Sequence, residues 1–341
     1  MPPPRSSKRL LTLFLFFPVL ASLLTAYSQC AEDTTSQPNI AMATTRILKW
    51  RDDKKAVFLL CFDDSAPSAV KLVVPELKKR KITGTFYINP GNGPYKSLKS
   101  DWETTVPGPG IEYANHTFTH VGATSAVQLD QELAPCNDEI NKCYPDRNPK
   151  RLISFGRPGG VPWTVSPAET EAALKKYSLI ERPPFIGYPF QIKTQEQMLS
   201  YVDKTLASGE MEQLVFHGVG GDWLVTPFEM FTSLLDKLEE HSSELWLTDP
   251  ISWHQYLTER KLSEIKILGS TSSQIKLQLV SDFDTNLYDL PLSLSTAVPK
   301  AWKSCSIQQG SLKATYPVID GQVFYQATPG KGEIIIEPAG A

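Results

Sequence analysis

The chain has 341 residues, with 34 Lys and Arg against 37 Asp and Glu, which gives a formal net charge of −3. This balance, without any long cluster of Lys and Arg, argues against a nucleic-acid partner. The sequence shows neither internal repeats nor low-complexity segments, so we expect ordinary globular domains rather than a repeat array.

The first residues have the pattern of a secretory signal. Basic residues precede an apolar run at 10–24, and small residues follow near Ser28. The run contains Pro18 and is short for a membrane-spanning helix. We therefore expect a signal peptide at residues 1–28, then a polar linker at 29–48.

This signal predicts a secreted, periplasmic or cell-envelope protein without stable membrane insertion after cleavage. Cys30 leaves a lipid anchor as an alternative, although Gln29 stands where such a site has a small residue. Removing the signal leaves about 310 residues, which suits one large and one small domain.

Residues 49–261 alternate short apolar β-rich runs with helical patterns, which is typical of an α/β fold with parallel strands. The expected strands are 56–62, 84–88, 111–115, 152–155, 177–181, 213–216 and 245–247. The expected helices are 68–80, 126–142, 167–176, 195–207, 227–241 and 250–261.

The region 262–341 has β-rich runs separated by Gly, Pro, Asn and Asp, and its helical periodicity is lost. The expected strands are 264–268, 274–280, 292–295 and 333–336. We expect a small all-β, sandwich-like domain, with either a structural or a sugar-binding role.

Cys136 and Cys143 are close enough in sequence to close a short loop. In an oxidising compartment they are candidates for a disulfide, and two free buried thiols are the alternative. A zinc site built on them lacks the further Cys or His that it would need.

Two adjacent carboxylates, Asp63 and Asp64, directly follow the first apolar strand. The carboxyl ends of strands in α/β barrels are where active sites are built. Asp pairs also start turns and cap helices, so this pair alone is a weak signal.

His116 and His120 follow the third expected strand and are two of only five histidines. Histidines four apart share a face if the segment turns helically, so both rings can reach one ion. Together with one carboxylate they leave open coordination positions, which favours a catalytic metal. Asn115 also starts a glycosylation sequon, but a glycan there would crowd the metal.

Two further segments follow strands. The glycine-rich 155–160 contains Arg157, which is placed either to hold a carboxylate ionised or to lie in an ordinary turn. His217 ends the strand at 213–216 and is placed to act as an acid or a base.

In this order, the segments resemble the polysaccharide deacetylase (NodB-homology) family, carbohydrate esterase family 4, over roughly residues 49–261. The resemblance implies a distorted (β/α) barrel and an acetylated polysaccharide or oligosaccharide as partner. It implies Asp63 as catalytic base, Arg157 as the arginine that steadies it, and His217 as general acid. It also implies a divalent metal, usually zinc, held by Asp64, His116 and His120.

The sequence departs from the family pattern in places. Ser65 replaces a glycine, and Gly159 and Gly160 replace a Pro-aromatic pair. The family's Asp and Trp from an intermediate strand have no clear match, and Glu181 is the only acid in that region to nominate.

We expect Trp223 to replace the missing tryptophan as a wall beside the acetyl group. Asp222 would then replace the acid, either by orienting His217 or by pairing with Arg157. The alternative is structural, with Trp223 packing on the next helix and Asp222 capping it.

The expected activity is metal-assisted hydrolysis of acetyl groups. Asp63 would take the proton of the attacking water, and His217 would protonate the leaving group. The metal and a backbone N–H near Gly160 would stabilise the oxyanion. N-deacetylation, a hydrolase reaction on a non-peptide carbon–nitrogen bond, is the leading hypothesis. An O-acetyl esterase on xylan-like polymers and a non-catalytic sugar-binding module are the alternatives.

Overall fold

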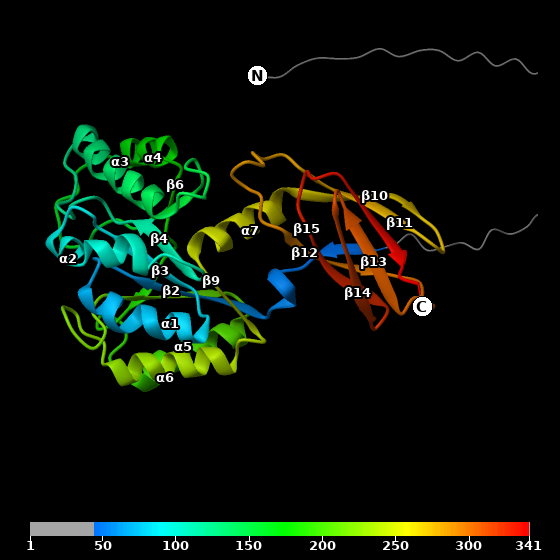
Figure 1. The fold of residues 1–341 in the computed structure, drawn as a ribbon, viewed down its shortest axis with the longest axis horizontal. Helices are drawn as coiled ribbons and strands as arrows, with labels where there is room; N and C mark the ends of the chain where they lie inside the picture. The colour runs from blue at the N-terminus through cyan, green and yellow to red at the C-terminus, as the bar shows by residue number, and fades with distance from the viewer. Residues whose placement is uncertain (1–43, 341) are drawn as a thin grey trace, which may run out of the picture. The chain divides into compact units, whose positions relative to one another are not determined.

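The computed structural model describes residues 44–340 (Figure 1). The expected signal peptide, Cys30 and most of the expected linker lie outside the described residues. Within the described part of the chain, no helix has the length and apolar character needed to cross a membrane.

A parallel sheet forms the frame of the α/β domain. Its strand order is β6-β5-β4-β3-β2-β8-β7, with β9 also paired to β2. Because β6 and β7 are the two ends of this order and do not pair, the sheet is an incomplete barrel. The strands are β2 (Ala56–Phe62), β3 (Gly84–Ile88), β4 (Ile111–Asn115), β5 (Ile153–Phe155), β6 (Leu179–Glu181), β7 (Ile186–Gly187), β8 (Met211–Phe216) and β9 (Leu245–Thr248).

Helices connect these strands, and local sequence explains where several of them begin and end. The Ser125 side chain accepts a hydrogen bond from the backbone of α3, and Ser166 forms a capping box with Glu169 at the start of α4. The helices are the short 3-10 turn η1 (Arg51–Asp53), the π-helical turns η2 (Ala69–Val73) and η3 (Asp101–Thr105), and α1 (Val74–Arg80), α2 (Gly93–Ser97), α3 (Ala126–Cys143), α4 (Pro167–Lys176), α5 (Gln195–Ser208), α6 (Phe228–Glu240) and α7 (Pro250–Leu262).

Every strand and helix expected between residues 49 and 261 is present, with bounds that differ by at most two residues, although the helix expected at 68–80 is divided into η2 and α1. The two-residue β7 and the five-residue α2 were not expected, because such short elements carry too few residues for a periodic pattern.

The C-terminal region is an antiparallel all-β domain with the strand order β1-β12-β15-β14-β13-β16-β11-β10. Alternate residues of β11, including Leu277 and Leu279, are buried with apolar residues of β12 and β15, so the strands enclose one core. The strands are β1 (Thr45–Ile47), β10 (Ser263–Ser270), β11 (Ile275–Ser281), β12 (Leu292–Ala297), β13 (Ser304–Gln309), β14 (Leu312–Ile319), β15 (Gln322–Ala327) and β16 (Glu333–Pro338).

The expected linker at 29–48 is wrong at its end, because Thr45–Ile47 is β1 and pairs with β12. Three residues have no recognisable strand pattern of their own. Their partner lies some 250 positions further along the chain, so the pairing is a long-range contact that local sequence cannot show.

Strand β2 contributes to two cores. Phe58, Leu60 and Phe62 pack in the core of the α/β domain, whereas Val57 and Leu59 pack in the cluster that contains the apolar residues of the β domain. Since successive side chains of a strand point to opposite faces, burial on both faces requires the continuous apolar run seen in the sequence.

Cys136 and Cys143 are free and buried, so the disulfide prediction is wrong and its alternative is confirmed. Both lie on helix α3, seven residues apart, which separates their Cα atoms by roughly 10 Å. A disulfide requires less than about 7 Å.

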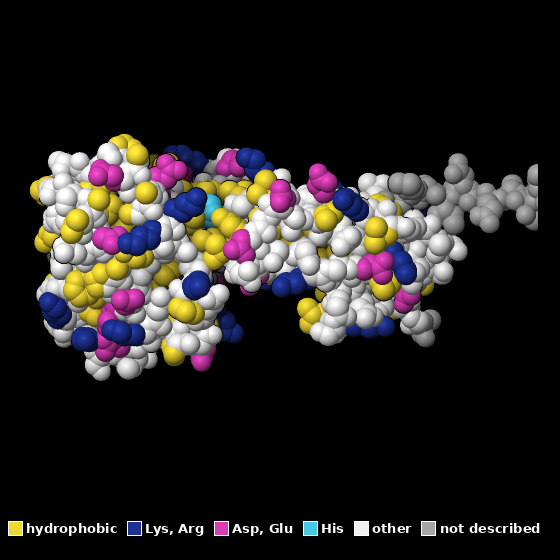
Figure 2. Space-filling model, turned by 90° about the horizontal axis from the view of Figure 1, so that it is seen from above, with side chains coloured by type: hydrophobic (Ala, Val, Ile, Leu, Met, Phe, Trp, Pro, Cys, Tyr) yellow, Lys and Arg dark blue, Asp and Glu magenta, His cyan; other side chains and the backbone are white. Residues whose placement is uncertain are grey.

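The surface agrees with the near-neutral charge of the chain. Figure 2 shows acidic and basic side chains interspersed over the visible face, without a broad patch of one sign.

Candidate active site

The turn after β2 places Asp63 and Asp64 at the carboxyl edge of the sheet. The Asp63 N–H still donates to the Phe216 carbonyl of β8, and the backbone then turns sharply through left-handed φ values of 68° at Asp64 and 53° at Ser65. Such values are costly for residues with a side chain. The Ser65 hydroxyl accepts a hydrogen bond from the Asn89 N–H at 2.9 Å, which helps to hold this turn.

The loop after β4 brings His116 and His120 together, but not through a helix as the sequence suggested. Residues 116–120 have no helical structure, and left-handed φ values at Thr117 and His120 turn the chain instead. The two imidazole centroids lie 5.1 Å apart. The buried Asn89 amide donates to the carbonyls of His116 and Thr117 and fixes the loop.

Asn115 is fully buried, and its side-chain amide donates to the Leu133 carbonyl and to Asn137. A glycan therefore cannot be attached at Asn115, although the sequence around it matches a glycosylation sequon.

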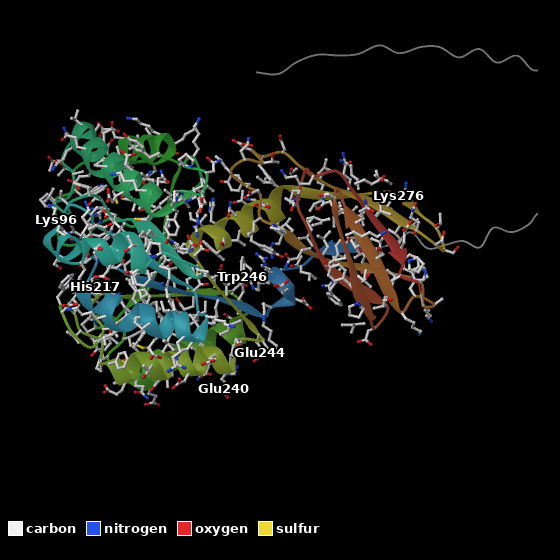
Figure 3. All side chains as sticks on the ribbon, in the orientation of Figure 1. Lys96, His217, Glu240, Glu244, Trp246 and Lys276 are labelled. Carbon is white, nitrogen blue, oxygen red and sulfur yellow. The ribbon has the colours of Figure 1, made fainter. Side chains whose placement is uncertain are left out.

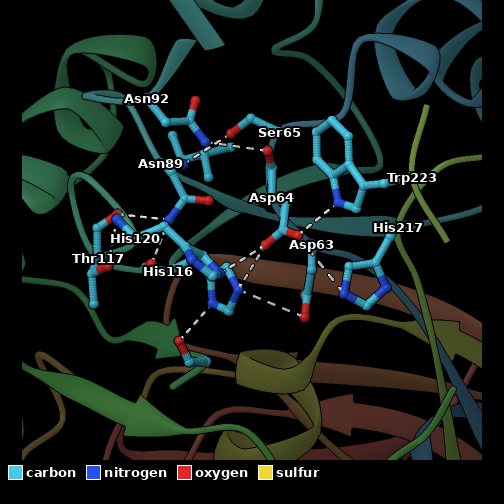
Figure 4. Close-up of polar contacts among 12 residues, drawn as sticks. Asp63, Asp64, Ser65, Asn89, Asn92, His116, Thr117, His120, His217 and Trp223 are labelled. Atoms are coloured by element: carbon cyan, nitrogen blue, oxygen red, sulfur yellow. Dashed lines mark hydrogen bonds and ion pairs between the residues drawn. The ribbon is translucent and has the colours of Figure 1, made fainter. Parts of the chain in front are cut away.

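Asp64, His116 and His120 form a compact donor set, shown in Figure 4. The Asp64 Oδ1 atom lies 3.3 Å from His116 Nε2 and 3.1 Å from His120 Nε2. This oxygen is buried and has no hydrogen-bond partner among the described residues. An unsatisfied buried carboxylate oxygen facing two imidazole nitrogens fits a divalent cation such as zinc.

The second nitrogen of His116 supports this arrangement. His116 Nδ1 lies 2.7 Å from the Gly156 carbonyl oxygen, which can only accept, so Nδ1 carries the hydrogen. In the neutral ring, the lone pair of Nε2 is then directed toward Asp64. This outer hydrogen bond is the kind that orients metal-binding histidines.

Electrostatics also favour cation binding here. Burial alone would raise the pKa of Asp64, but the adjacent imidazoles of His116 and His120 hold that pKa well below its ordinary value. The Asp64 carboxylate, 3.1 Å from His120 Nε2, in turn raises the pKa of His120 against the opposing effect of burial. A metal would replace these protons and be bound by neutral imidazoles.

Arg182, which follows β6, holds Asp63. Its two terminal nitrogens donate to the two Asp63 oxygens at 2.7 and 2.8 Å, and the side chains are only 7% and 4% exposed. The guanidinium lies between the rings of Tyr87 and Phe185, at 4.6 and 4.3 Å from their centroids. Burial raises the pKa of Asp63, but Arg182 and then His116 outweigh it, so the pKa is lowered and the carboxylate stays ionised.

The assignment of Arg157 as the arginine that steadies Asp63 is therefore wrong. Arg157 is exposed, and its guanidinium lies 5.1 Å from the centre of the Trp163 ring. Gly160, the expected source of an oxyanion N–H, is also exposed, with no heavy atom within 4 Å of where its Cβ would be.

Gly156 explains why the guanidinium that reaches Asp63 comes from β6. A Cβ at this position would lie 2.8 Å from the Tyr87 ring and 3.1 Å from Arg182 Cζ. The absent side chain therefore leaves the space that Arg182 occupies.

His217 lies where β8 ends, with Nε2 3.9 Å from Asp64 Oδ2. Its buried Nδ1 has no hydrogen-bond partner in the described chain. Asp222 does not orient it or pair with Arg157, contrary to expectation. The Asp222 carboxylate instead accepts from the Ser68 N–H at 2.6 Å, next to the start of η2. The other acid nominated, Glu181, is exposed.

Trp223 reaches the site as expected, but it makes a contact that the sequence did not suggest. Its indole Nε1–H donates to Asp64 Oδ2 at 2.9 Å (Figure 4). The tryptophan is thus bonded to a member of the proposed donor set, and the expected wall beside the acetyl group stays a prediction.

The chain is similar to one protein family and to several solved structures. A family model described as polysaccharide deacetylase matches residues 51–176. The solved structures with similar folds include a family 4 carbohydrate esterase from Streptomyces lividans in complex with acetate. It is 17% identical, with 56% of this chain and 91% of that chain covered and a TM-score of 0.42. The peptidoglycan deacetylase PdaC from Bacillus subtilis is 15% identical, with 60% and 93% covered and a TM-score of 0.45.

A mutant of BA3943, a carbohydrate esterase family 4 pseudoenzyme with restored enzymatic activity, is 16% identical, with a TM-score of 0.43. The match covers 58% of this chain and 66% of that chain. These identities and TM-scores are too low to transfer a substrate or an activity. No curated protein matches the chain.

The matched segment contains the Asp63-Asp64 turn and both histidines of the donor set, and it is part of the parallel, incomplete barrel. Its family comprises hydrolases that deacetylate glycans and generally depend on a metal. Residues 51–176 of this chain belong to the polysaccharide deacetylase (NodB-homology) family.

Proposed function

We propose that this protein removes N-acetyl groups from a sugar polymer with the help of a bound zinc ion. The observation that carries the proposal is the pairing of two carboxylates on one turn. Asp64 faces two imidazole nitrogens, whereas the adjacent Asp63 is kept ionised by Arg182. A module that only binds sugars requires neither feature.

Asp64, His116 and His120 would hold the zinc ion. When bound, it would polarise the acetyl carbonyl and lower the pKa of a water molecule towards about 7. Three protein ligands leave coordination positions for water and substrate, as catalytic zinc sites do.

Asp63 is the proposed general base. One of its oxygens, Oδ2, lies 3.8 Å from His116 Nε2, so the carboxylate borders the donor set without belonging to it. The two hydrogen bonds from Arg182 fix its orientation and keep it able to accept a proton from water.

His217 is the proposed general acid. Its Nε2 lies next to Asp64 on the rim of the same site and can carry a proton to the leaving group. An amine leaving group must be protonated as the carbon–nitrogen bond breaks, whereas an alkoxide from an ester depends less on an acid. The presence of His217 therefore supports N-deacetylation over O-acetyl ester hydrolysis.

The test measures acetate released by zinc-reconstituted protein from N-acetylglucosamine oligomers and from O-acetylated xylo-oligosaccharides. We expect acetate and free amine from the N-acetylated oligomers, loss of zinc and acetate in His116→Ala, and loss of acetate alone in His217→Ala. His254→Ala is the matched control, because His254 lies on α7 beside Tyr288.

Acetate from the O-acetylated oligomers alone would overturn the proposed substrate. Zinc-loaded, folded protein that releases acetate from neither substrate would indicate a sugar-binding module instead.

A further inference from the structure

We propose that Trp223 is a positioning residue that sets the affinity of the metal site by reserving one oxygen of Asp64 for the ion. The inference rests on the proposed function, because it requires that Asp64 bind a metal. It adds to the site a residue outside the matched segment 51–176.

The two oxygens of Asp64 have different surroundings. Oδ2 accepts the indole N–H of Trp223 at 2.9 Å. Oδ1 has no hydrogen-bond partner and lies within 3.3 Å of the Nε2 atoms of both His116 and His120. The carboxylate is therefore oriented so that Oδ1 faces the two imidazole nitrogens while Oδ2 is held by the indole N–H.

The chemistry of the donor matters. An indole N–H donates but cannot accept, does not titrate in the physiological range and does not coordinate a metal ion. It therefore holds Oδ2 in the presence or absence of metal and favours a ligand that binds through one oxygen. A carboxylate that is fixed before binding loses less side-chain entropy when the ion arrives.

The loop that carries Trp223 is closed by its own backbone. The Gly218 N–H donates to the Trp223 carbonyl, and the Thr226 N–H donates to the Gly218 carbonyl, both at 2.9 Å. A Cβ on Gly218 would lie 2.0 Å from the Gly221 carbonyl oxygen, so this closure requires glycine.

A second contact ties the loop to the turn that carries Asp64. Asp222, next to Trp223, accepts from the Ser68 N–H at 2.6 Å, and the Ser68 hydroxyl accepts from the Val219 N–H at 3.1 Å. Ser68 is only four residues after Asp64. The indole and the carboxylate are thus held by one short segment, which explains the role of Asp222 better than an interaction with His217.

The test is the zinc dissociation constant of the full chain, measured by competition with a chelator. Trp223→Phe keeps an aromatic ring but removes the N–H together with part of the ring system, and we expect zinc to bind about 10-fold to 100-fold more weakly, the range for lost outer hydrogen bonds at metal sites. Trp246→Phe is the matched control, since Trp246 lies on β9, apart from His217 in Figure 3, and should bind zinc as the wild type does.

Zinc affinity of Trp223→Phe within twofold of the wild type would overturn the inference and leave the proposed function intact. Wild-type protein that fails to bind zinc would refute the proposed metal site itself. If Trp223→Phe does not fold, Asp222→Ala decides, because it retains the indole but releases the loop. Weaker zinc binding by this variant is expected, and unchanged binding would overturn the inference.

Discussion

Replacing Arg182 with Met tests the most consequential correction to the sequence-based site. The substitution keeps an unbranched side chain that can still lie between Tyr87 and Phe185, but it removes both hydrogen bonds to Asp63. Asp63 would then be a buried carboxylate without its cation, next to the metal site.

The expected loss follows from the burial of the pair. Exposed ion pairs contribute about 0–1 kcal/mol, whereas removing one partner of a buried pair costs about 3–5 kcal/mol. With side chains 7% and 4% exposed, Arg182 and Asp63 belong to the second class. Arg157→Met, the matched control, removes an exposed guanidinium from the Trp163 ring and should cost at most about 1 kcal/mol.

The assay is urea unfolding at neutral pH with saturating zinc, followed by turnover of each variant. Arg182→Met should lose both stability and activity, and Arg157→Met should retain both. In the double variant with Asp63→Asn, the losses should be less than additive, because the charge left unpaired by either single change is gone. A loss below about 1 kcal/mol for Arg182→Met, or equal losses for the two arginines, would refute the assignment of Arg182.

Three further predictions follow from the same contacts. Asp63→Asn should still bind zinc but turn over about 100-fold to 10,000-fold more slowly, since an amide cannot accept the proton; a near-normal rate would require another base. Gly156→Ala should displace Arg182 and lower turnover, whereas Gly159→Ala, with open space at its Cβ, should have little effect on turnover in the same assay. Burial raises the pKa of Glu259 from 4.5 to about 8, so its ionisation increasingly destabilises the folded state as the pH rises from 4.5 through 8. Glu259→Gln should therefore melt at a higher temperature than the wild type at pH 8 and close to it at pH 4; an equal difference at both pH values would contradict this.

Most elements of the α/β domain were predictable because their signals are local. β2 and β3 are recognisable as β-rich, largely apolar runs because both of their faces are buried, and α4 begins at a capping box that is explicit in the sequence. Strand β1 shows the limit of such signals. Only its pairing with β12 defines it, and that pairing is formed between distant parts of the chain.

The structure brings together the three residues predicted to hold a metal, but not through the local geometry that the sequence suggested. Spacing suggested a helical turn between His116 and His120, whereas left-handed residues reverse the loop. Asp64 and the histidines still come together because they follow the parallel strands β2 and β4, which are separated only by β3 and end at the same edge of the sheet. The left-handed φ of Ser65 also accounts for the glycine that the family has at this position, since glycine adopts it without strain.

The arginine could not be identified from the motif alone, because the chain has two Arg-Pro pairs after adjacent strands. Arg157-Pro158 follows β5 and matches the family motif, and Arg182-Pro183 follows β6. The acid nominated on the second strand, Glu181, was one residue away from the functional side chain. Neighbouring strand residues point to opposite faces, so Glu181 is exposed while Arg182 points inward.

What Asp63 requires is a guanidinium at a fixed point in space, and the sequence position from which it comes is secondary. β5 and β6 are hydrogen-bonded parallel neighbours, so a side chain leaving either carboxyl end begins near the same place. Gly156 leaves the required space at the end of β5, and Phe185 provides a second ring for the guanidinium arriving from β6. With Arg182 in the place expected for Arg157, Asp63 is still paired with a guanidinium, and Arg157 is left exposed beside Trp163. A substitution that removes the arginine from the motif position should therefore be judged by whether a neighbouring strand supplies the charge.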